Sequence, residues 1–131
     1  MSNNAKVLID TSVWIEYFNK PKSAHGNNVK NLIEADSAFI SGIIMAELLQ
    51  GAGNTMTYEE LRNAMLFMPY LAENQATWEK TGRLSFELKR KGKTIPLSDC
   101  IIAVLSKENG CLLYTLDSHF NIIPEVKFYT A

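Results

Sequence analysis

The sequence predicts an α/β fold in three layers, with helices on both faces of a central, mostly parallel sheet. Short aliphatic runs alternate with longer segments in which apolar residues recur at helical spacing, an order typical of parallel sheets. No internal repeat or linker-like tract breaks this alternation, and 131 residues are enough for one hydrophobic core but not for two. We therefore expect a single domain over residues 1–131.

The expected elements follow from these patterns. Strands are predicted where a short aliphatic or β-branched run is bounded by polar residues, at 6–9, 37–41, 111–116 and 126–129. Helices are predicted over the amphipathic or apolar segments 13–18, 29–33, 43–50, 57–68, 75–91 and 98–109. Thr57 with Glu60 has the pattern of a capping box, Ser98 that of an N-cap, and Gly92 that of a helix end.

The composition is that of a folded domain, because 47% of the residues are hydrophobic and 21% are charged. A net charge of -1 argues weakly against nucleic-acid binding, so any contact with a polyanion must come from a local patch or a bound cation. The polar start Met1–Lys6 lacks the apolar stretch of a signal peptide. No apolar run reaches the roughly 20 residues that span a bilayer. We expect a cytoplasmic protein.

The cysteines and histidines give weak signals. Cys100 and Cys111 lie in apolar runs without partners at zinc-binding spacing, so both should pack as small hydrophobic side chains. His119 could act as a base or bind phosphate, but a lone His beside a core Phe is more often a surface or capping residue. His25 lies in a segment expected to be a polar loop. Neither histidine is taken as a site residue.

Four acidic residues occupy related places in the predicted fold. Asp10 and Asp117 each follow a strand, Glu47 lies in the helix after the second strand, and Asp99 begins the helix that leads to the strand before Asp117. In parallel sheets, ligands gather beyond the carboxyl ends of the strands. We therefore expect the four carboxylates to share one edge of the sheet.

Such a cluster predicts a divalent cation. Several carboxylates within a few ångströms repel one another, and a cation removes that penalty. Ligation by oxygen alone suits hard ions such as Mg²⁺ or Mn²⁺, which keep water ligands and bind phosphate oxygens. Ions of this kind activate water and stabilise the leaving oxygen when a phosphodiester is hydrolysed.

The same residues resemble a known family. Asp10-Thr11-Ser12 after a strand, Met-Ala-Glu47-Leu, Ser98-Asp99 before Ile-Ile-Ala, and Thr115-Leu-Asp117 before His119-Phe together resemble a PIN domain, most of all the VapC-type toxins of toxin–antitoxin pairs. The resemblance extends from about Val7 to Tyr129. The final motif departs from many relatives, which often carry another acid near the aromatic residue, so here Asp117 alone must serve.

The resemblance has definite implications. It implies a Mg²⁺- or Mn²⁺-dependent endoribonuclease in which Asp10, Glu47, Asp99 and Asp117 hold the metal and Ser12 and Thr115 support them. It also implies a homodimer and a small antitoxin protein whose C-terminal segment covers the site. A basic cluster at the end of one predicted helix gives the candidates for RNA contact, namely Lys89, Arg90, Lys91 and Lys93.

Other interpretations stay open at this point. Each acid could be a plain cap, a turn residue or a solvated helix residue, and the basic cluster could be solvated. The chain could also be a non-catalytic PIN-fold scaffold for RNA or protein, or a nuclease that processes RNA outside a toxin–antitoxin pair. A phosphotransferase with Asp10 as nucleophile is a further rival, but no Lys stands in a convincing partner motif.

Overall fold

The computed structural model describes residues 5–131. The strands are β1 (Val7–Ile9), β2 (Ala38–Ser41), β3 (Tyr70–Leu71) and β4 (Leu112–Tyr114). The helices are α1 (Thr11–Asn19), α2 (Ala24–Glu34), α3 (Gly42–Gln50), α4 (Thr55–Met65), α5 (Gln75–Arg90), α6 (Leu97–Glu108) and the 3₁₀ helix η1 (Ser118–Ile122). The expectation that the chain has no signal peptide concerns its first residues, and residues 1–4 lie outside the described part.

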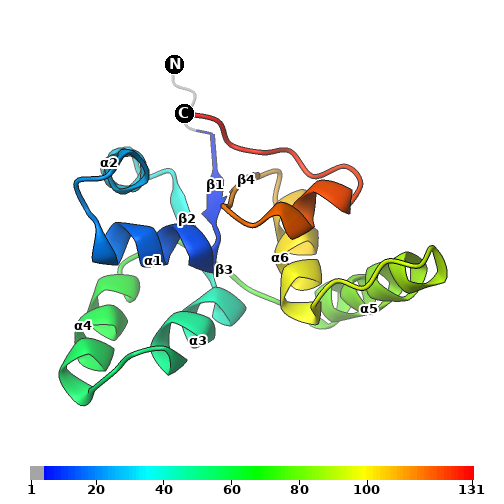
Figure 1. Cartoon of the computed structure of the whole chain (residues 1–131), viewed down its shortest axis with the longest axis horizontal. Coiled ribbons are helices and arrows are strands. Elements are labelled where there is room, and N and C mark those ends of the chain that lie inside the picture. Colours follow the sequence, from blue (N-terminus) through cyan, green and yellow to red (C-terminus); the bar gives the residue numbers. More distant parts are fainter. Residues whose placement is uncertain (1–4) are drawn as a thin grey trace.

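The sheet is fully parallel and has the strand order β3-β2-β1-β4. Because crossovers between parallel strands are right-handed, the steps from β1 to β2 to β3 place their helices on one face, and the return to β4 places α5 and α6 on the other. Figure 1 shows this arrangement, with α1 to α4 on one side of the strands and α5 and α6 on the other. The predicted three-layer α/β fold is confirmed.

The strand order also determines where a ligand can bind. The chain leaves β1 toward β2, whereas β4 lies on the opposite side of β1, so the direction of winding reverses between β1 and β4. Such a reversal opens a crevice beyond the carboxyl ends of the two strands. The segments that follow Ile9 and Tyr114 therefore face the expected binding place.

The core lies on both faces of this sheet. All residues of β1 are buried, as expected for a central strand covered on both sides, and α6 is buried from Cys100 to Ser106. Cys100 and Cys111 belong to this core as free thiols, which confirms their predicted packing role. Burial raises the pKa of both thiols. Within the part of the chain described, no helix is both long and apolar enough for a membrane span.

The prediction of a last strand over residues 126–129 is wrong. Pairing there is confined to one parallel bridge between Leu113 and Phe128, in which the backbone N–H of Leu113 donates to the carbonyl of Lys127 and the carbonyl of Leu113 accepts the N–H of Tyr129. The segment pairs at too few positions to form a strand, although it lies along the outer edge of β4. The short strand β3 was not predicted, because two residues carry no readable alternation.

Several predicted helix starts also need correction. Asn54, not Thr57, caps α4, and its side chain accepts a hydrogen bond from the backbone N–H of Thr57 at 2.8 Å. The N-cap of α6 is Pro96 rather than Ser98, since proline pre-sets the backbone just before the first turn. Helix α2 begins at Ala24, so His25 lies on a helix and not in a loop.

Candidate metal centre

Asp10 directly follows β1 and occupies the N-cap position of α1, but its side chain makes no capping hydrogen bond. Instead, its Oδ2 atom accepts hydrogen bonds from Ser12 Oγ at 2.9 Å and from Thr115 Oγ1 at 2.7 Å. The residue is only 5% exposed. The interpretation of Asp10 as a simple helix cap is therefore wrong, and both predicted supporting hydroxyls contact it.

Asp99 lies in the first turn of α6, with a side chain 13% exposed. Burial is the largest cause that raises the pKa of its carboxyl above the ordinary value, and the hydrogen bond with His119 opposes this shift. The charges of Asp117 and Asp10 add to the increase. The three carboxyls thus lie close enough to repel one another, although they come from different parts of the chain.

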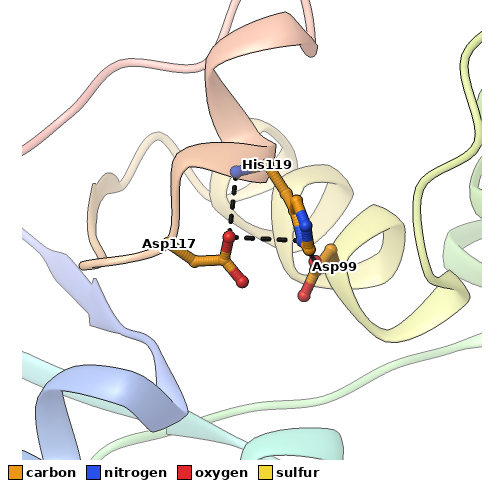
Figure 2. A group of neighbouring side chains, drawn as sticks. All are labelled: Asp99, Asp117 and His119. Carbon is orange, nitrogen blue, oxygen red and sulfur yellow. Dashed lines mark hydrogen bonds and ion pairs between the residues drawn. The ribbon is translucent and has the colours of Figure 1, made fainter.

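Asp117 caps the 3₁₀ helix η1 by accepting the backbone N–H of His119 at 2.9 Å. Its own backbone N–H donates to Thr115 Oγ1 at 3.0 Å, so one hydroxyl contacts both Asp10 and Asp117. Asp117 is therefore a turn residue through its Oδ1 atom, as one of the alternative interpretations holds. In Figure 2 its second oxygen makes no marked contact with the other two residues drawn.

Glu47 lies in the middle of α3 and is half-buried. Its Oε1 atom accepts a hydrogen bond from Thr11 Oγ1 at 2.6 Å. Thr11 directly follows Asp10, so this contact ties the helix that carries Glu47 to the end of β1. The structure therefore joins Glu47 to the cluster through Thr11, a residue to which the sequence analysis gave no role of its own.

The basic cluster lies at the end of α5 and in the turn that follows, and all four of its side chains are exposed. Lys89 is near enough to Cys100 to lower the pKa of that thiol, partly offsetting the effect of burial. Cys100 adjoins Asp99 in the sequence. The positive charge of Lys89 therefore lies near the start of α6, the helix that carries Asp99 in its first turn.

His119 is the residue that the sequence analysis undervalued. Its Nδ1 atom lies 3.1 Å from Asp99 Oδ2 and 3.2 Å from Asp117 Oδ1, as Figure 2 shows. Among residues 5–131, Asp99, Asp117 and His119 form the group whose ligand atoms all lie within 4.8 Å of one another. The Asp-x-His spacing in a capped turn is the signal that could have pointed to this residue.

A divalent cation fits this set of donors. Asp99 and Asp117 offer carboxylate oxygens, and Asp10, whose charge is felt at Asp99, adds a third negative group beside them. A cation placed there stabilises the ionised form of Asp99, whose pKa is raised mainly by burial and further by the neighbouring acids. Hard divalent ions bind such oxygen ligands and keep open positions for water or phosphate.

The doubly wound parallel sheet and its acidic edge define a class of α/β proteins with carboxylates gathered at a switch point. The model of one family in this class, described as PIN domain, matches residues 7–126. The chain belongs to the PIN-domain family.

Known proteins resemble the chain over nearly its full length. Ribonuclease VapC11 of Mycobacterium tuberculosis is 29% identical over 124 residues, which cover 92% of this chain and 92% of the relative. Ribonuclease VapC2 of Rickettsia felis is 27% identical over 124 residues, with 91% and 92% covered. The crystal structure of VapBC2 from Rickettsia felis, bound to a DNA fragment from their promoter, matches with a TM-score of 0.80. At 23% identity, the match covers 94% of this chain and 96% of that one.

Proposed function

We propose that this protein is a Mg²⁺- or Mn²⁺-dependent endoribonuclease and the toxin of a toxin–antitoxin pair, acting in the cytoplasm. The observation that carries the proposal is that Asp10, Asp99 and Asp117 meet beyond the carboxyl ends of β1 and β4, where Thr115 joins Asp10 to Asp117 and His119 joins Asp117 to Asp99. PIN-domain nucleases depend on divalent cations, and the curated relatives are ribonucleases, which supports the same assignment.

The roles proposed for the residues follow from their contacts. Asp10, Asp99 and Asp117 hold the cation, and Glu47 ligates it or orients a water from the wall formed by α3. Ser12 and Thr115 hold the Asp10 carboxyl in one orientation, because both hydroxyls donate to the same oxygen. When bound, the cation supplies an activated water and stabilises the leaving oxygen of the scissile phosphodiester.

A protein partner is part of the proposal. A groove of about 220 Å³ lies beside Glu47 and is lined by apolar side chains of α1, α3 and α4, including Ile15, Phe18, Leu48 and Leu61. Apolar residues of an antitoxin segment fit such a groove, and a cationic residue of that segment can reach the acid on its wall. We also propose that the chain forms a homodimer, as the family resemblance implies.

The test is RNA cleavage by the pure protein with and without EDTA. We expect EDTA to abolish cleavage, added Mn²⁺ or Mg²⁺ to restore it, and Asp10→Asn to remain inactive with either ion. Asp36→Asn is the matched control, because Asp36 is exposed and its left-handed backbone is one that Asn tolerates. Full cleavage in chelator would exclude the metal-dependent reaction, and RNA binding without cleavage under any ion would favour the scaffold interpretation.

A further inference from the structure

The position of His119 is fixed by its neighbours on the turn. The backbone N–H of His119 donates to Asp117 Oδ1, and the next residue, Phe120, is fully buried in the core. These two anchors hold the turn of η1 beside the start of α6. The side chain of His119 is 54% exposed, while its Nδ1 atom faces the two carboxyls (Figure 2).

The distances around Nδ1 are informative. The atom lies 3.1 Å from one carboxylate oxygen and 3.2 Å from another, on two different residues. A single N–H cannot point along both lines, so at most one of the contacts is a well-aligned hydrogen bond. Two donors held about 2.1 Å from a cation, at right angles around it, lie about 3.0 Å apart. The Nδ1 atom therefore has the spacing of a neighbouring ligand to each carboxylate oxygen, and the ligand atoms of all three residues lie within 4.8 Å of one another.

We propose that His119 is itself a ligand of the divalent cation, through Nδ1, together with Asp99 and Asp117. This inference rests on the metal site of the proposed function and changes its chemistry from all-oxygen to mixed imidazole and carboxylate. A nitrogen ligand is accepted by first-row transition ions, whereas Mg²⁺ prefers oxygen alone. The site therefore selects Mn²⁺, or a similar transition ion, over Mg²⁺.

Pulsed EPR of the full-length protein loaded with Mn²⁺ tests this directly, because nitrogen coordination produces a hyperfine modulation that oxygen ligands do not. The chain has two histidines, so His25→Gln is the matched control for His119→Gln. His25 lies on α2 and contacts the hydroxyl of Tyr114 instead of the acidic group. We expect the nitrogen modulation in the wild type and in His25→Gln, and its loss in His119→Gln.

Calorimetric titration gives a second readout that does not depend on activity. Loss of a residue that merely orients a ligand weakens metal binding by about 10- to 100-fold. We therefore expect His119→Gln to weaken Mn²⁺ binding at least about 10-fold and Mg²⁺ binding much less. Because the His119 side chain is 54% exposed and Gln keeps a hydrogen-bond donor for Asp99, the variant should melt close to the wild-type temperature in EDTA.

The outcomes separate this proposal from the function on which it rests. Wild-type protein that binds Mn²⁺ and cleaves RNA without nitrogen modulation would overturn the His119 ligand and leave the nuclease intact. Nitrogen modulation that disappears in His119→Gln, in a protein that cuts no RNA, would support the ligand and overturn the nuclease. Equal losses of Mn²⁺ and Mg²⁺ affinity in His119→Gln would contradict the selectivity.

Discussion

Thr115→Val probes the geometry of the acidic site with the smallest change of shape. Valine replaces the hydroxyl by a methyl group of similar size. The hydroxyl donates to Asp10 Oδ2 at 2.7 Å and accepts the backbone N–H of Asp117 at 3.0 Å. The substitution therefore removes one of the two donors to a buried carboxylate and loosens the turn that carries Asp117.

The size of the effect follows from these contacts. A hydrogen bond to a charged group contributes about 1.5–3 kcal/mol, and Thr115 is half-buried, so we expect a loss of about 2 kcal/mol in the free energy of unfolding without metal. The freed N–H of Asp117 is partly solvated and adds little. For a domain of this size, the loss corresponds to a decrease of roughly 6 °C in the melting temperature. Binding of Mn²⁺ should weaken by about 10- to 100-fold, because Asp10 loses part of its orientation.

Thermal unfolding in EDTA and calorimetric titration with Mn²⁺ measure both quantities. Thr130→Val is the matched control, since Thr130 is exposed, and its stability should stay within about 0.5 kcal/mol of the wild type. Equal melting temperatures for Thr115→Val and this control would refute the reasoning, because the hydroxyl would then contribute nothing to the buried carboxylate. A loss of stability with unchanged Mn²⁺ affinity would refute only the link to the metal.

Two further variants test charge. The pKa of Asp99 is raised, mainly by burial, so its proton is bound more tightly in the native state and its ionised form destabilises the metal-free protein. Asp99→Asn should therefore raise the melting temperature in EDTA near neutral pH. This gain should disappear as the pH falls toward 3.8, the ordinary pKa of an aspartate. A gain that stays constant with pH would contradict the raised pKa of Asp99. The double variant Lys89→Glu and Lys93→Glu should weaken RNA binding and flatten its salt dependence. RNA affinity is measured against salt concentration in a cleavage-deficient variant, and Lys22→Glu with Lys30→Glu is the control pair. An unchanged salt slope would show that RNA enters elsewhere.

Much of the fold could be predicted because it depends on local patterns. The aliphatic runs at β1, β2 and β4 are buried on both faces, and such runs are readable without knowledge of their partners. The failures share a cause. The segment 126–129 has the composition of a strand, but a strand also needs a partner along its length, and only Phe128 finds one. Likewise β3 exists through its pairing with β2, not through its own sequence.

The sequence by itself determined the parallel α/β class and the four acids, because strand ends and helix starts are local features and parallel strands bring their ends to one edge. It also marked Ser12 and Thr115 as supporting residues through the family resemblance. Only the tertiary structure decided which groups meet. The strand order places β1 next to β4, which brings the Thr115 hydroxyl to Asp10 across 105 positions of sequence. The packing of η1 beside the start of α6 likewise places His119 next to Asp99. Contacts between such distant segments depend on tertiary packing, which no local sequence pattern encodes.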